Sequence, residues 1–138
     1  ITMANNVLLG GHVVVENNAT FGGLAAVHHF TTVGESAFIG GMARISLDVP
    51  PYMLVEGSPM KVWSINKVGL KRQGFTAEAV ESLKEAHRCL YREDYSRVEA
   101  LKILRDKLWG CREVQTLVNF LDRADQGHKG RARQPSCE

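Results

Sequence analysis

The stretch that decides the fold runs from residue 1 to residue 48 and reads, cut every six residues, ITMANN VLLGGH VVVENN ATFGGL AAVHHF TTVGES AFIGGM ARISLD. The first residue of each hexad is small or β-branched, and the third is always apolar. These third residues are Met3, Leu9, Val15, Phe21, Val27, Val33, Ile39 and Ile45. Eight hexads in one phase argue against a few ordinary strands joined by turns.

The hexad has the chemistry of one side of a triangular coil. Its first and third residues point inward, because side chains alternate along a strand. Its last three positions are rich in Gly, Asn and Ser, which tolerate a tight corner. Three hexads then make one coil, and stacked coils bury the apolar face that no single coil buries alone. The repeat therefore predicts a parallel β-helix over residues 1–50.

Composition excludes several classes of protein. The net charge of the 138 residues is only +2, which does not favour a nucleic-acid or membrane binder. We find no apolar run long enough to span a bilayer, and we expect no signal peptide. Cys89, Cys111 and Cys137 lack metal-ligand or redox spacing, so we expect reduced thiols in a cytoplasmic protein. We expect no metal and no cofactor.

The rest of the chain changes character after the Pro50–Pro51 pair. We expect a connecting extended segment over 51–65, a helical domain over 66–124 and a disordered basic tail over 125–138. The first helix is predicted over 66–73, and Thr76 is predicted to cap the second. Ser96 and Glu99 form a capping box for a third helix with an apolar stripe. That stripe is Val98, Leu101, Leu104 and Leu108, and a fourth helix carries Val114, Leu117, Val118 and Leu121.

The 18-residue period of the coil brings three histidines to one corner. His12 ends the second hexad, and His28 and His29 end the fifth, one coil later. A histidine there suits a general base for a hydroxyl nucleophile, and Gly11 offers an unhindered N–H to an oxyanion. Alternatively, these residues face solvent or pack between subunits. A histidine metal site is less favoured, because no carboxylate or thiol joins the corner.

A second candidate site is the basic segment GLKRQGF at 69–75. Lys71 and Arg72 on a helix suit phosphate oxygens, and arginine offers a bidentate fork. The alternative is a basic helix end that complements its own dipole.

Together these motifs resemble a known family. The resemblance rests on the hexads and on three segments: NNATFGGLAAVHHF at 17–30, DVPPYMLVEG at 48–57 and INKVGLKRQGF at 65–75. Together they resemble the second half of the UDP-N-acetylglucosamine O-acyltransferases, which belong to the hexapeptide-repeat acyltransferase superfamily. This family catalyses the first step of lipid A biosynthesis. The resemblance runs from residue 1 to about residue 94. Because the chain starts inside the repeat and without methionine, we expect that further N-terminal coils belong to the protein.

The resemblance implies a left-handed parallel β-helix followed by an α-helical C-terminal domain, in a homotrimer with active sites between neighbouring prisms. It implies transfer of an (R)-3-hydroxyacyl chain from acyl carrier protein to the glucosamine 3-hydroxyl of UDP-N-acetylglucosamine. Gly11 matches the oxyanion donor, and His12 and His28 match active-site histidines. His29 replaces a glutamine that contacts the sugar. The catalytic base of the family lies about one coil before His12, so residues 1–138 alone are expected to be inactive.

The resemblance also assigns substrate-binding positions. Asn66 matches a residue of the nucleotide site, Arg72 matches an arginine that contacts the sugar nucleotide, and Gly41 falls where acyl-chain length is set. Val68 and Gln73 stand where some members have Glu and Arg. The acidic carrier protein needs a basic docking surface, and basic side chains of the helices are candidates for it. The alternative is that these side chains form an ordinary solvated helix face. The candidates are Lys71, Arg72, Lys84, Arg88 and Arg92.

Two other functions remain open at this point. One is a hexapeptide acyltransferase that uses acyl-CoA and a different acceptor. The other is a non-catalytic trimeric module that binds a sugar nucleotide or a carrier protein.

Overall fold

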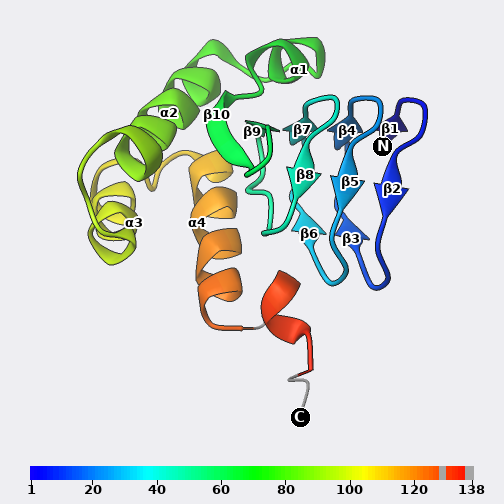
Figure 1. Ribbon diagram of the computed structural model, residues 1–138. Coiled ribbons are helices and arrows are strands. Elements are labelled where there is room, and N and C mark those ends of the chain that lie inside the picture. The colour runs from blue at the N-terminus through cyan, green and yellow to red at the C-terminus, as the bar shows by residue number, and fades with distance from the viewer. Residues whose placement is uncertain (128–129, 136–138) are drawn as a thin grey trace.

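The repeat folds into a triangular prism. The computed structural model describes residues 1–127 and 130–135 (Figure 1). Each hexad contributes one short strand: β1 (Thr2–Met3), β2 (Leu8–Leu9), β3 (Val14–Val15), β4 (Thr20–Phe21), β5 (Ala26–Val27), β6 (Thr32–Val33), β7 (Phe38–Ile39) and β8 (Arg44–Ile45). Strands 18 residues apart pair in parallel, as Thr2 does with Thr20 and Leu8 with Ala26. The fold is the predicted left-handed parallel β-helix followed by helices.

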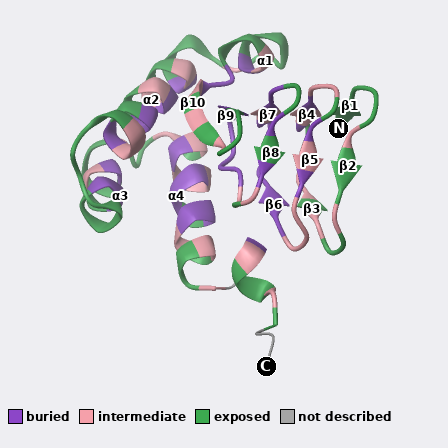
Figure 2. Ribbon diagram, in the orientation of Figure 1, coloured by how far each residue is buried: buried purple, intermediate pink, exposed green. Residues whose placement is uncertain are grey.

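The inside of the prism is filled by the first and third residues of the hexads. Phe21, Ile39 and Ile45 are at most 1% exposed, in agreement with the predicted alternation. At the N-terminal end the third residues of the hexads are exposed instead: Met3 is 43% exposed and Leu9 is 42% exposed. Figure 2 shows the same exposure along β1 and β2. Burial therefore increases from β1 towards the helices.

The corners differ from the expectation in one respect. The sixth residue of seven successive hexads takes the left-handed conformation, with φ between 54° and 63°. These residues are Asn6, His12, Asn18, Leu24, Phe30, Ser36 and Met42, and none is glycine. The glycines occupy the fourth and fifth positions instead, and Gly10, Gly22 and Gly34 at the fourth position lie against the backbone of the next coil. Each left-handed side chain costs about 1–2 kcal/mol, which the stacked coils offset.

The segment after Pro50–Pro51 is extended, as expected, but it does more than connect. β9 (Met53–Glu56) pairs in parallel with β7, so it adds a further rung to the sheet of β1, β4 and β7. β10 (Lys61–Ile65) then pairs antiparallel with β9. The prism thus extends beyond residue 50 and ends in a hairpin on which the helices pack.

The helical part begins where the caps predict. Its elements are α1 (Lys67–Arg72), α2 (Ala77–His87), the π-helical turn η1 (Arg88–Arg92), α3 (Arg97–Lys107) and α4 (Arg112–Asp125). Thr76 caps α2, and Ser96 with Glu99 forms the expected capping box of α3. The predicted stripe of α4 is fully buried. No helix within the described ranges is long and apolar enough to cross a membrane.

Two expectations for this part are wrong. Val98 was expected on the buried stripe of α3, but it is 77% exposed, because α3 buries Ala100, Leu101 and Leu104 instead. The tail was expected to be disordered, but η2 (Gly130–Arg133) is a 3₁₀ turn beside the prism (Figure 1). The predictions for residues 128–129 and 136–138, among them the reduced thiol of Cys137, fall outside the described residues.

Candidate functional site

The 18-residue register brings the three histidines to one corner. We call Gly10–His12 and His28–Phe30, which stack one coil apart, the histidine corner. The Phe30 N–H donates to the Gly11 carbonyl oxygen at 2.9 Å, and the Gly10 N–H donates to Val27 at 2.8 Å. These hydrogen bonds hold the two coils in the spacing that the repeat predicts.

The side chains of the histidine corner form a row of rings. The ring centroids of His28 and His29 are 3.8 Å apart, and those of His29 and Phe30 are 5.8 Å apart. His12 stacks on Phe30 at 4.5 Å with 14° between the ring planes. His12 is exposed, whereas His28 and His29 are half-buried. Imidazoles at the surface can bind and exchange protons with a substrate.

Two adjacent glycines in the corner have different surroundings. A Cβ on Gly10 would lie 2.5 Å from the backbone nitrogen of His29, so only glycine allows the coils to approach this closely. A Cβ on Gly11 would meet no atom within 4 Å. The Cβ side of Gly11 therefore faces open space, whereas that of Gly10 faces the next coil.

An arginine from the tail reaches the same corner. Arg133 Nη2 donates to the carbonyl oxygens of His12 at 3.0 Å and Phe30 at 3.2 Å. Its guanidinium carbon lies 5.7 Å from the centroid of the Phe30 ring. Sequence reasoning missed this contact, because nothing in a basic tail indicates which distant corner it meets.

The second group of predicted residues lies around α1. Asn66 is buried; its side chain accepts from the Gly69 N–H at 3.2 Å and donates to the Ser36 carbonyl oxygen at 3.0 Å. The Ser36 hydroxyl donates to Gln73 Oε1 at 2.6 Å. Asn66 and Gln73 thus attach α1 to the prism through Ser36. Arg72 is exposed on the same helix.

The predicted site residues occupy three different corners. The N–H of Ser36, which holds α1, donates to the Asn17 carbonyl oxygen on one corner, whereas His12 stacks on Phe30 on another. Gly41 belongs to the third corner and lies over Gly23. Neighbouring corners are one hexad apart, a separation of up to about 20 Å. One chain therefore groups the histidines but does not bring Arg72 or Gly41 to them.

A buried polar pair supports the corner that carries α1. The Tyr52 hydroxyl donates to the Glu35 carboxylate. Burial, together with this hydrogen bond, raises the pKa of Tyr52 above its ordinary value. The sequence offered no signal for this pair, because Tyr52 lies in the segment where the hexads end.

The candidate basic surface is only partly assembled. Lys84, Arg88 and Arg92 line one groove of about 480 Å³ together with Lys67. The Lys84 ammonium is 2.7 Å from Glu81, and Arg88 pairs with Glu85 and Glu93, so part of the positive charge is neutralised. The other two candidates, Lys71 and Arg72, are exposed on α1.

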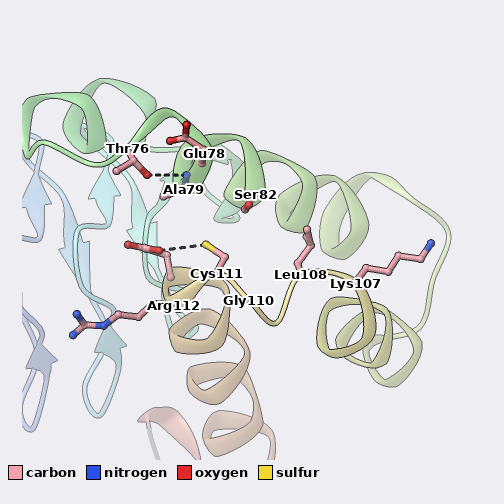
Figure 3. Close-up of a pocket in the computed structure, with 10 residues that line it drawn as sticks. Thr76, Glu78, Ala79, Ser82, Lys107, Leu108, Gly110, Cys111 and Arg112 are labelled. Atoms are coloured by element: carbon pink, nitrogen blue, oxygen red, sulfur yellow. Dashed lines mark hydrogen bonds between the residues drawn. The ribbon is translucent and has the colours of Figure 1, made fainter.

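A cleft of about 450 Å³ lies among the helices (Figure 3). Three of its polar groups are engaged with neighbours: Thr76 caps α2 through the Ala79 N–H at 3.1 Å, and the Cys111 thiol donates to Glu113 at 3.3 Å. Within the described residues, no group of three or more His, Cys, Asp or Glu residues is arranged to hold a metal. We assign no site to this cleft.

Comparison with known proteins identifies the family. Residues 48–130 match the family model described as Udp N-acetylglucosamine O-acyltransferase, Domain 2. The acyl-[acyl-carrier-protein]--UDP-N-acetylglucosamine O-acyltransferase of Synechocystis is 41% identical over 132 residues, 94% of this chain and 48% of that protein. The enzyme of that name from Myxococcus xanthus is 42% identical over 115 residues, 83% of this chain and 45% of that protein. The chain thus spans about half the length of these curated relatives.

Solved structures agree with this result. The UDP-N-acetylglucosamine acyltransferase of Arabidopsis is 36% identical with a TM-score of 0.85, and the alignment covers 93% of this chain and 47% of that one. The UDP-N-acetylglucosamine O-acyltransferase of Moraxella catarrhalis is 31% identical with a TM-score of 0.83, over 88% of this chain and 48% of that one. The chain therefore belongs to the UDP-N-acetylglucosamine O-acyltransferase family.

Proposed function

We propose that this chain is the C-terminal part of an enzyme that transfers an (R)-3-hydroxyacyl group from acyl carrier protein to UDP-N-acetylglucosamine, the first step of lipid A biosynthesis. The names of its relatives support the donor and the acceptor. The observation that carries the proposal is the histidine corner, where the rings of His12, His28 and His29 form one row with Phe30 on the corner that also contains Gly11.

In the proposed reaction a histidine removes the proton of the sugar 3-hydroxyl as its oxygen attacks the thioester carbonyl. The Gly11 N–H donates to the oxyanion that develops on the carbonyl oxygen. Collapse of the intermediate forms the ester and releases the carrier thiol. The base is expected one coil before His12, so residues 1–138 alone are expected to be inactive. In the full-length protein His12, His28 and His29 would orient the reacting groups.

We further propose that a neighbouring copy in a homotrimer completes each site. The support is geometric: the histidines and α1 lie on different corners of one prism, so α1 of a second chain would have to face the histidine corner. Arg72 would then contact the nucleotide, Asn66 and Gln73 would position α1 in this nucleotide site through their bonds to the prism, and Gly41 would limit the acyl chain. A cytoplasmic location agrees with the use of a carrier protein.

Calorimetry with UDP-N-acetylglucosamine tests the acceptor site in the full-length protein. Arg72→Ala should weaken binding about tenfold or more, because it removes a charged hydrogen bond to phosphate. Lys71→Ala is the matched control on the same helix and should change the affinity less than threefold. An unchanged affinity of Arg72→Ala would remove Arg72 from the site.

A donor assay separates the proposal from its alternatives. Acyl carrier protein thioester should be used far better than acyl-CoA, and reversing the charge of Arg92 should raise KM for the carrier protein. Preference for acyl-CoA would indicate a different hexapeptide acyltransferase. Sugar-nucleotide binding without transfer by the full-length protein would indicate a binding module.

A further inference from the structure

A separate cleft is lined by residues from the end of the prism, the β9–β10 hairpin, α4 and the turn η2. We call it the tail cleft, because Arg131 and Ala132 of the tail form part of its wall. Its volume is about 480 Å³, within the range of small-molecule sites. Met60, Val62 and Leu121 give it a largely apolar lining.

Two buried donors in the wall of the tail cleft lack partners. The Tyr91 hydroxyl and Arg131 Nε are buried but make no hydrogen bond within the described part of the chain, where Thr31 Oγ1 is the third such atom. An unsatisfied buried donor costs about 1–3 kcal/mol, so such atoms are rare and call for an explanation. Both atoms belong to residues that line the tail cleft, so one acceptor bound there is a candidate partner for each.

The charges around the cleft favour an anionic acceptor. Lys61, Arg97 and Arg131 line it, against the carboxylates of Asp48 and Asp125. The Asp48 carboxylate already accepts from the backbone N–H groups of Thr32 at 2.8 Å and Arg131 at 3.2 Å. Burial raises the pKa of Tyr91 to about 12, so its hydroxyl keeps its proton and remains a donor.

We propose that the tail cleft binds a medium-chain carboxylate. The carboxylate accepts from the Tyr91 hydroxyl and Arg131 Nε, and the alkyl chain packs against Met60, Val62 and Leu121. This site is distinct from the histidine corner and does not depend on the proposed acyl transfer. It also has a consequence for the tail, because an occupant that binds Arg131 would hold η2, and with it Arg133, on the prism.

Calorimetry of the full-length protein with sodium decanoate, below its micelle concentration, tests the proposal. Wild-type protein should bind one decanoate per chain, and Tyr91→Phe should weaken binding at least about tenfold. Arg131→Lys should weaken it similarly, because the charge stays but the Nε–H is lost. Tyr95→Phe, outside the tail cleft, is the matched control and should bind like wild type.

Two further probes separate the chemistry of the head from that of the chain. Decanol lacks the carboxylate and acetate lacks the chain, so each should bind at least tenfold more weakly than decanoate. Melting curves check folding: Tyr91→Phe without ligand should melt no lower than wild type, since it removes an unpartnered hydroxyl. Absence of saturable decanoate binding, or equal affinity of wild type and Tyr91→Phe, would overturn the proposal.

Discussion

At the scale of single residues, the histidine corner depends on two glycines with different tasks. Gly10 lies against the backbone of His29, whereas the side of Gly11 faces open space. The sequence shows both as the same residue type in the same corner. Only the stacked coils separate the glycine that permits packing from the one that leaves room for a ligand.

This difference gives a stability prediction. Gly10→Ala should lower the free energy of unfolding by about 1–3 kcal/mol, because the new methyl group overlaps the His29 backbone. Gly11→Ala is the matched control and should change it by less than about 0.5 kcal/mol. Urea unfolding measures both. Equal losses would mean that the two coils do not approach as described.

His87 gives a prediction for pH. Burial, and secondarily the charge of Arg92, lower its pKa below the ordinary value of 6.5. Above that value His87 is neutral in both states and has no effect. As the pH falls below it, the unfolded chain takes up the proton first, so stability decreases until the folded pKa is reached. The His87→Gln variant should lose less stability than wild type between pH 7 and pH 5, and parallel melting curves for the two would contradict this.

At the scale of elements, local signals predicted most of the fold. Apolar third positions of the hexads predicted the coil, and Thr76 and Ser96 predicted where α2 and α3 begin. Two features escaped, because packing decides them: the non-glycine corner residues in the left-handed conformation, and the exposure of Val98. The π-helical turn at 88–92 was not predicted either.

The capping box of α3 can be tested directly. Ser96→Ala removes the acceptor of the Glu99 N–H and should cost about 1 kcal/mol of stability. Val98→Ala, in the same first turn, should cost less than about 0.5 kcal/mol, because Val98 is exposed. Urea denaturation of both variants checks the order; a larger loss for Val98→Ala would place that side chain in the core.

At the scale of the whole molecule, the predictable part of the site is the part that the repeat controls. The period alone placed His12, His28 and His29 on one corner, because each coil repeats the last. It could not place α1, whose position depends on the hairpin and on the hydrogen bonds of Ser36. For the same reason it could not predict that Arg133 of the tail would reach His12.

The division of the site between corners leads to our central claim, that two chains complete each active site. The most direct test mixes full-length His28→Ala and Arg72→Ala chains, each nearly inactive alone, and lets them assemble together. With random assortment of equal amounts, about one quarter of the interfaces combine an intact histidine corner with an intact α1. The account predicts acyl-transfer activity close to that fraction of wild type, whereas activity no greater than that of the separate variants would contradict it.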